Sequence, residues 1–198
     1  MSTPRRRPAA RRGEGEKLRA EILDVTARML EESGDASTLS LRAIARETGV
    51  AATSIYLHFD SLETLVRAVK EQKYEELREV LQAADTAAPD DPPRRLHAAT
   101  KAYVDFALER PGTYKVLFGT SVDLPPDGEG RFIGERAFQV AVEVLASTRK
   151  SRDDAYLGAT QLWCAMHGMV TLRALHPNFP WPSVDDQIDD LIERLFLS

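Results

Sequence analysis

Apolar residues recur every three or four positions along most of this 198-residue chain, and no segment shows the convincing apolar–polar alternation of a strand. This spacing is that of amphipathic α-helices. The first such pattern, through Leu18, Ile22 and Leu30, ends at Gly34, where a C-terminal cap belongs. The pattern predicts an all-α fold with three short helices, a connecting helix and a larger helical bundle.

Capping residues set the limits of the next helices. Ser40 is suited to start the short helix "SLRAIARETG", which Gly49 ends because glycine tolerates a positive φ. Further along, Asp60 and Glu63 have the spacing of a capping box. They predict the start of a long linking helix over residues 60–84.

The segment "TAAPDDPP", residues 86–93, is the clearest break in the helical pattern and a candidate domain boundary. The sequence after this break predicts further helices, near residues 94–109, 111–118, 130–150, 152–176 and 183–196.

Charge is distributed unevenly. The net charge is -5, yet residues 1–13 hold arginines and no acid, whereas residues 61–198 hold 16 Lys and Arg against 22 Asp and Glu, a difference of -6. Residues 1–16 are also rich in Pro and Gly, which predicts a disordered basic arm. The arginines of the arm are Arg5, Arg6, Arg7, Arg11 and Arg12.

The remaining composition narrows the class of protein. A hydrophobic content of 43% is enough for a core in one large domain or two small ones. Cys164 is the single cysteine, so no internal disulfide can form and a reduced, cytoplasmic setting is expected. There is neither an apolar run of about 18 residues, as a membrane span needs, nor a secretory signal.

The stretch "GVAATSIYLHFD", residues 49–60, carries the most specific pattern. A helix over Ala52–His58 would place Ile55 and Phe59 in a core. Its opposite face would be small, polar and uncharged, which suits close approach to another surface. Together with the preceding helix and the glycine turn, this predicts a helix-turn-helix whose second helix enters the DNA major groove.

Candidate DNA contacts follow from that geometry. Thr53 and Ser54 can hydrogen-bond to bases or phosphates, Leu57 can meet a thymine methyl group, and Arg42 can hold the backbone. The basic arm can enter a neighbouring minor groove. The full predicted DNA-binding set is Arg42, Ala51, Ala52, Thr53, Ser54, Tyr56, Leu57 and His58, with Arg5, Arg6, Arg7, Arg11 and Arg12 of the arm.

These residues resemble the DNA-binding domain of the tetracycline-repressor (TetR) family of bacterial regulators. The resemblance lies in "TLSLRAIARETGVAATSIYLHFDSLETL", above all in Tyr56-x-His58-Phe59. Further on, "RPGTYKVLF" and "LWCAMHGMVTL" resemble one family branch with a Trp-x-x-x-His-Gly signature, here Trp163, His167 and Gly168. The resemblance implies a basic arm at 1–16, a DNA-binding domain at 17–62 and a ligand-binding and dimerisation domain at 63–198.

The chain departs from the family pattern near the second helix. Ala51, Ala52 and Thr53 stand where members often have Ser-Lys-Gly, and Leu62 stands where a lysine is common. The helix therefore lacks a cap and two phosphate-binding cations, and the basic arm is expected to supply part of that attraction.

Aromatic and methionine side chains in the second half predict a core with a ligand cavity in it, since adaptable walls of this kind are common in ligand sites. Ordinary core packing is the alternative for each residue alone. Few charges are available there, so an apolar or aromatic ligand is expected. The predicted ligand-binding set is Tyr103, Phe106, Tyr114, Phe118, Trp163, Met166, His167 and Val170.

No cofactor, metal or catalytic group is predicted. Cys164 and His167 lie three positions apart on one helix, but two ligands do not make a metal site. A Cys–His nucleophilic pair would need a third orienting group.

The last two predicted helices carry apolar stripes that exceed what one bundle can cover. The family resemblance implies that they form a C2 homodimer, whose two second helices would lie about one DNA turn apart on a palindromic operator. The prediction is a ligand-responsive regulator, a repressor rather than an enzyme. The alternatives are a regulator controlled by a protein partner, and a lipid carrier or enzyme that kept the fold.

Overall fold

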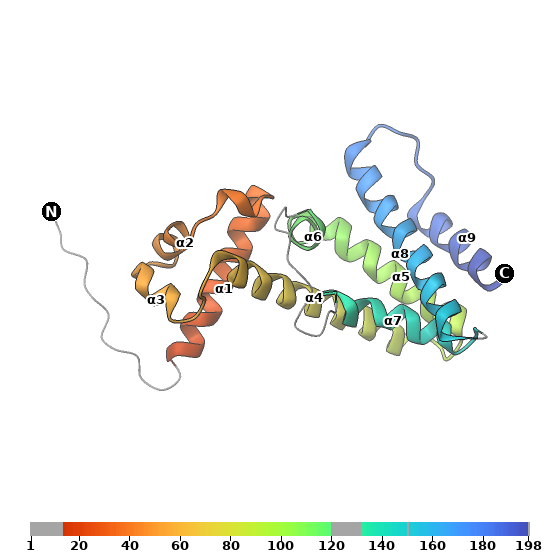
Figure 1. Ribbon diagram of the computed structural model, residues 1–198. Coiled ribbons are helices and arrows are strands. Elements are labelled where there is room, and N and C mark those ends of the chain that lie inside the picture. Colours follow the sequence, from red (N-terminus) through yellow and green to blue (C-terminus); the bar gives the residue numbers. More distant parts are fainter. Residues whose placement is uncertain (1–13, 120–131, 150, 198) are drawn as a thin grey trace. The chain divides into compact units, whose positions relative to one another are not determined.

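The computed structural model describes residues 14–119, 132–149 and 151–197, which form helices and turns without a strand (Figure 1). The all-α prediction is confirmed for these residues. In chain order the elements are α1 (Glu14–Ser33), the 3-10 helix η1 (Ala36–Thr38), α2 (Leu41–Thr48), α3 (Ala52–Tyr56), α4 (Leu62–Ala87), α5 (Pro92–Glu109), α6 (Pro111–Phe118), α7 (Glu135–Ala146), α8 (Arg152–Leu175) and α9 (Val184–Leu197).

The chain divides into two compact units, and the division falls inside α4. The helix-turn-helix unit includes the described residues up to Val69, and the bundle unit includes those from Lys70 onward. Both α4 and α5 contribute to the bundle unit. The break predicted at residues 86–93 is therefore a turn within this unit and not a domain boundary.

Glycine and serine set the helix ends in the helix-turn-helix unit. Gly34 and Gly49 have φ values of 69° and 73°, a left-handed conformation that favours glycine. The Ser40 hydroxyl accepts a 3.2 Å hydrogen bond from the Ala43 N–H, which confirms Ser40 as the cap of α2.

The predicted capping box at Asp60 is wrong by one residue. The Ser61 hydroxyl, not the Asp60 carboxylate, accepts the N–H of Thr64 at 3.1 Å, and α4 begins at Leu62. Asp and Ser are both strong capping residues, and the one nearer the helix supplies the cap here. α4 also continues to Ala87, beyond the predicted end at residue 84.

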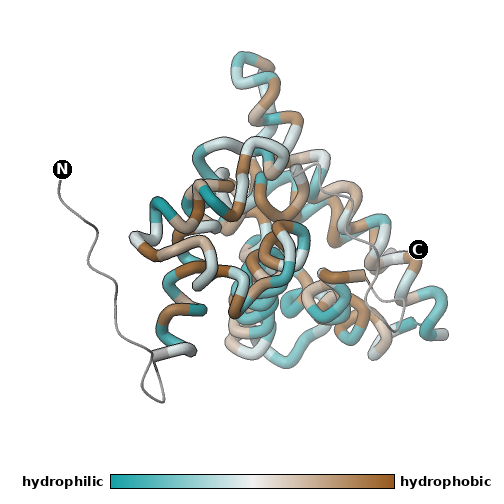
Figure 2. The backbone as a smooth tube through the Cα atoms, turned by 60° about the vertical axis from the view of Figure 1, so that its left-hand side comes forward, coloured by the Kyte–Doolittle hydropathy of each residue, from teal (hydrophilic) through white to brown (hydrophobic). Residues whose placement is uncertain are grey.

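Each unit has its own apolar core. In the helix-turn-helix unit, Ile22, Ile44 and Ile55 are completely buried and bring α1, α2 and α3 together. In the bundle unit, Leu96 of α5 and Leu162 of α8 are almost completely buried. Each such side chain contributes roughly 1.5–3 kcal/mol by leaving water. Apolar and polar stretches alternate along the helices (Figure 2), as expected for amphipathic helices that cover a core.

The apolar stripes of the last two helices have different environments. Ile188 and Ile192 of α9 are buried within the bundle unit, where α9 packs against α5. On α8, by contrast, Leu157, Leu172 and Leu175 are exposed. Among the described residues, the exposed apolar side chains of the two predicted stripes lie on α8, while Val184, Leu191 and Phe196 of α9 are half-buried.

A partly buried ion pair joins α4 to α5 across their turn. Arg95 donates two hydrogen bonds to the Asp85 carboxylate, of 2.8 and 3.1 Å. The Asp85 side chain is only 7% exposed and that of Arg95 29%. A carboxylate this deeply buried is costly unless a cation accompanies it.

A second polar contact joins α6 to α8. The Tyr114 hydroxyl lies 2.6 Å from Nδ1 of His167, and the two rings stack. A neutral imidazole with its hydrogen on Nε2 can accept a hydrogen bond from this hydroxyl. Burial lowers the pKa of His167, so the fold favours the neutral ring.

Replacing Arg95 by Met should lower the free energy of unfolding by about 2–3 kcal/mol, because the buried Asp85 carboxylate loses its partner. Denaturant unfolding measures this loss. The matched control is Arg152→Met, which breaks the exposed Arg152–Glu143 pair and should cost less than about 1 kcal/mol. The double variant Asp85→Asn/Arg95→Met should recover much of the loss. Equal costs for the two single variants would contradict a stabilising role for this pair.

The pH dependence of stability should reveal His167. The unfolded chain binds its proton near pH ~6.5, whereas the folded chain does so only at lower pH, because the pKa is lowered by burial. This contribution to stability is complete above pH ~6.5 and is lost as the pH falls through the folded pKa. Between about pH 7.5 and 5, Tm should therefore fall more steeply in the wild type than in His167→Gln. Parallel curves of Tm against pH would rule this out.

Candidate nucleic-acid interface and ligand cavity

The helix-turn-helix is held together by a short set of apolar and backbone contacts. After Gly49 ends α2, the Val50 N–H donates a 2.9 Å hydrogen bond to the Ala45 carbonyl. Ile55 of α3 and Phe59, just beyond it, are 0% and 2% exposed. These contacts position α3 with its opposite face toward solvent.

The second helix is shorter than predicted. α3 ends at Tyr56, and Leu57 and His58 form a turn instead of continuing the helix to His58. Ala51 at its start provides no side-chain cap, as the sequence indicated. The turn still places Phe59 in the core, so the exposed side chains of α3 and of the turn still face away from that core.

The face predicted to meet DNA is open. Tyr56 is 54% exposed and Leu57 83% exposed, although buried positions are usual for large apolar side chains. No described residue of the predicted set is fully buried. Arg42, Ala51, Thr53, Tyr56 and Leu57 are exposed, and Ala52, Ser54 and His58 are half-buried. The predicted arm contacts Arg5, Arg6, Arg7, Arg11 and Arg12 lie outside the described residues.

Further cations accompany this face that the sequence analysis did not single out. The first turn of α1 lies beside the turn that follows α3, since a Cβ on Gly15 would stand 3.8 Å from the His58 ring. The Arg19 guanidinium lies 5.2 Å from the Phe59 ring centroid, and Lys17 nearby is exposed. In the sequence, the position of Lys17 and Arg19 directly after the basic arm could have indicated that they extend its positive charge.

An aromatic cavity lies in the bundle unit and has a volume of about 50 Å³. Among the residues that the structure describes, its walls come from α4, α5, α6, α7, the residues just before α7, and α8, and these lining residues include no Asp, Glu, Lys, Arg or His. The lining residues are Tyr74, Leu77, Leu81, Tyr103, Phe118, Phe132, Gly134, Ala137, Phe138, Ala141, Ala159, Trp163 and Met166.

Half of the predicted ligand-binding set lines this cavity. Tyr103, Phe118, Trp163 and Met166 are lining residues, whereas Phe106, Tyr114, His167 and Val170 are not. α8 faces the cavity with Ala159, Trp163 and Met166, and His167 lies on an adjacent face of this helix. Val170 shares the face of Trp163 and Met166 but lies one turn further along the helix and is not a lining residue. Phe106 is buried, with the Arg110 guanidinium 5.1 Å from its ring centroid.

The sequence analysis missed the wall contributed by α4. Tyr74, Leu77 and Leu81 line the cavity from this helix. Their spacing of i, i+3 and i+7 was a detectable signal, but it is also that of an ordinary core stripe.

A chain of hydrogen bonds runs from the cavity wall to His167. Tyr103 lines the cavity, and its hydroxyl lies 3.0 Å from that of Tyr114. Tyr114 then meets His167 as described above. Burial raises the pKa of Tyr114 to about 12 and also raises the pKa of Tyr103. The phenols therefore stay neutral near pH 7 and their hydrogen-bonding groups already have partners within the protein.

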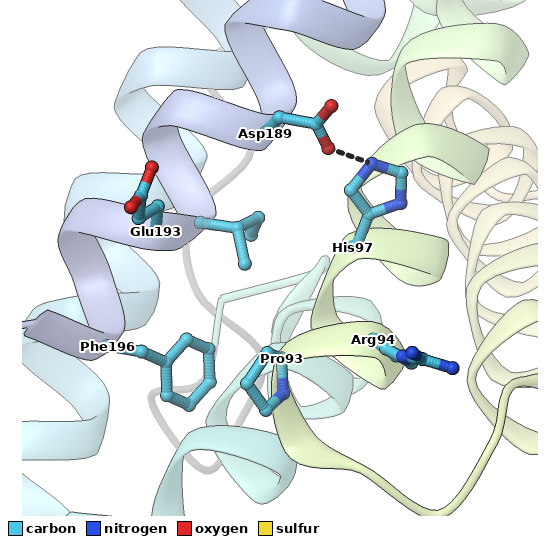
Figure 3. A pocket seen from close by; sticks show the side chains of 7 residues that line it. Pro93, Arg94, His97, Asp189, Glu193 and Phe196 are labelled. Atoms are coloured by element: carbon cyan, nitrogen blue, oxygen red, sulfur yellow. Dashed lines mark ion pairs between the residues drawn. The ribbon is translucent and has the colours of Figure 1, made fainter.

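A larger and more polar groove, of about 460 Å³, lies between α5 and α9 (Figure 3). His97 Nε2 and Asp189 Oδ1 meet across it at 2.9 Å. Its other lining residues mix a cation and a carboxylate with apolar side chains: Pro93, Arg94, Ile192, Glu193 and Phe196. Because the groove is open and has charges of both signs, it is a poorer match for the predicted apolar ligand than the smaller aromatic cavity.

The described part of the chain contains neither a candidate metal site nor a helix that could span a membrane. Among residues 14–119, 132–149 and 151–197, no three His, Cys, Asp or Glu side chains come together in a way that could hold a metal ion. None of the helices described here has the length and apolar character needed to cross a membrane.

Comparison with known proteins agrees with the helix-turn-helix geometry. Residues 22–69 match the "Bacterial regulatory proteins, tetR family", and residues 96–197 match the "Tetracyclin repressor-like, C-terminal domain". An uncharacterized HTH-type transcriptional regulator of Mycobacterium tuberculosis is 29% identical over 156 residues, which cover 78% of this chain and 69% of the relative. Other curated relatives are matched over only 53% of their own length.

Two further similarities extend over most of the chain. The nucleoid occlusion factor SlmA of Citrobacter koseri is 26% identical over 181 residues, covering 85% of this chain and 88% of SlmA. A solved structure from Rhodococcus sp. RHA1, of unknown function, has a TM-score of 0.75 at 24% identity and covers 91% of this chain and 94% of its own. The second similarity shows the fold alone. With both of its domains matched, the chain belongs to the TetR family of bacterial transcriptional regulators.

Proposed function

We propose that the chain is a cytoplasmic repressor that binds a palindromic operator as a homodimer and is released by a small apolar or aromatic ligand. The observation that carries the proposal is the exposed, uncharged face of α3 in a family of DNA-binding regulators. Thr53, Tyr56 and Leu57 can contact base edges and phosphates there, because their side chains are exposed and are not needed for packing of the core.

Affinity and selectivity for DNA come from different residues in this proposal. The α3 face has no charge, so it reads shape, methyl groups and hydrogen-bonding positions. Arg42, Lys17 and the basic arm neutralise phosphates, which raises affinity for any sequence and makes it depend on salt. This division offsets the absence of a cap and of cations on α3 itself.

Dimerisation follows from the exposed stripe of α8. Leu157, Cys164, Leu172 and Leu175 are exposed along one side of this helix. Side chains with this spacing lie on one helical face, and a second copy would remove them from water. A two-fold dimer would also present two copies of α3 to the two halves of a palindrome.

The aromatic cavity is the proposed effector site. Among the described residues its lining is apolar apart from one indole and two phenols that already have partners, so an ionised ligand would lose hydration without gaining a counter-charge from them. The ligand acts by binding more tightly to the form of the dimer that does not fit the operator.

A second candidate is control by a protein partner. The small cavity volume of about 50 Å³ favours it, and so does the similarity to SlmA, which is named as a nucleoid occlusion factor. The two proposals differ in what releases DNA. A panel of apolar compounds that changes neither operator affinity nor Tm would favour the protein partner.

Tyr56→Ala should weaken operator binding by at least about tenfold, in line with the ~1–3 kcal/mol of a specific contact. Its Tm should be unchanged, since Tyr56 is 54% exposed. The measurement is a fluorescence-anisotropy titration of an operator fragment selected from genomic DNA. Arg42→Ala should instead reduce the slope of log K against log salt by about 1. Unchanged affinity in both variants would contradict the proposed interface.

Leu172→Glu should convert the dimer to a monomer, because it places a charge on the apolar face of α8. Analytical ultracentrifugation measures the change. The control is Leu108→Glu on α5, as Leu108 is 46% exposed and Leu172 45% exposed. A dimer that survives Leu172→Glu but not Leu108→Glu would move the interface away from α8.

A further inference from the structure

The phenyl ring of Phe132 lies in the wall of the aromatic cavity, although its side chain is not fully buried. The residue precedes α7 and is 43% exposed. Its ring meets Tyr74 edge-on at 5.6 Å and Trp163 at 5.8 Å between centroids. The ring therefore has one side against the aromatic walls and another toward solvent.

Gly134 makes this position of the ring possible. A Cβ on Gly134 would lie 2.6 Å from Cε1 of Phe132 and 2.6 Å from Cε1 of Tyr74, closer than any real contact. The φ of Gly134 is -91°, which other residues also adopt, so the requirement is steric and not conformational. The Tyr74 ring is held by a hydrogen bond from its hydroxyl to the Leu117 carbonyl, whereas the Phe132 side chain has no hydrogen-bonding group and contacts the Tyr74 and Trp163 rings.

With Phe132 in place, the cavity is too small for a ring-sized ligand. Its volume is about 50 Å³, against roughly 150 Å³ for an apolar cavity that holds benzene. The surrounding rings of Phe118, Phe138 and Trp163 provide a surface suited to edge-to-face and offset contacts with another ring. A ligand that reaches them needs the space that Phe132 fills.

We propose that Phe132 is an internal plug whose phenyl ring occupies the binding position of a flat, uncharged aromatic group of the effector. This inference rests on the proposed effector site and names the ligand class and the residue that competes with it. The effector must displace the ring to bind. Its apparent affinity is therefore the intrinsic affinity of the open cavity multiplied by the fraction of molecules in which the ring is already displaced.

Two substitutions remove the plug in different ways. Phe132→Ala deletes the ring, and Gly134→Ala keeps the ring but fills the space that it needs. Because Tyr74 is held by its hydroxyl, the added methyl should drive Phe132 outward. Both variants should bind an aromatic probe more tightly than the wild type does.

The test is calorimetric titration of the full chain with indole and with toluene, repeated for each variant. We expect a Kd about tenfold lower in both variants, equal to ~1.4 kcal/mol. Phe179→Ala is the matched control, since it deletes a phenyl ring that is 55% exposed and packs against Trp181, and neither of these residues lines the cavity. This control should bind the probes as the wild type does.

The outcomes separate the plug from the proposed function. Tighter binding by Phe132→Ala alone would indicate a hole made by the substitution, and would overturn the plug. No gain in either variant would overturn it as well, even if an effector releases the wild-type protein from DNA. A gain in both variants supports the plug. If the bound probes then leave operator affinity unchanged in every protein, ligand control fails while the plug remains.

Discussion

One helix supplies apolar side chains to both cores, and this continuity of α4 is the constraint on which the rest of the structure depends. The helix has 26 residues. Leu65 and Val69 are buried in the helix-turn-helix unit, while Tyr74 and Leu77 line the cavity of the bundle unit. Any rearrangement of the cavity wall at Tyr74 therefore involves the helix that completes the DNA-binding core.

The fold was largely predictable because the residues that start and end its helices act on their own backbone or on close neighbours in the sequence. Gly34, Gly49 and Ser40 act through their own backbone conformation or through an N–H three residues away, so their roles can be read from the sequence. The errors arise where two local signals compete. Asp60 and Ser61 can each cap a helix, and spacing alone favoured Asp60, whereas in the structure α4 begins at Leu62, directly after Ser61. The break at residues 86–93 was real, but only tertiary packing shows that both flanking helices belong to one unit.

The DNA-binding face was also predictable, since one short helix needs only one periodic pattern to separate its buried side from its exposed side. The cavity was harder because five helices meet there. On α8, His167 faces another side of the helix than Trp163 and Met166, and Val170 lies one turn further along the helix, so neither His167 nor Val170 lines the cavity. Gly134 carried no signal at all: its role is to make room for two rings, one of them on α4, sixty residues earlier in the sequence.

The hydrogen-bonded chain from Tyr103 to His167 changes what a ligand can do in the cavity. Each hydroxyl on this path has a partner, so a ligand that offers one more acceptor or donor must break an existing bond to gain a new one. Such an exchange returns little free energy, because hydrogen bonds of similar strength replace each other. Selectivity must then come from shape and from contacts between rings. Phe132 already makes contacts of this kind with Tyr74 and Trp163. A ligand switches this protein only to the extent that its own shape and ring contacts in the cavity are more favourable than those of Phe132.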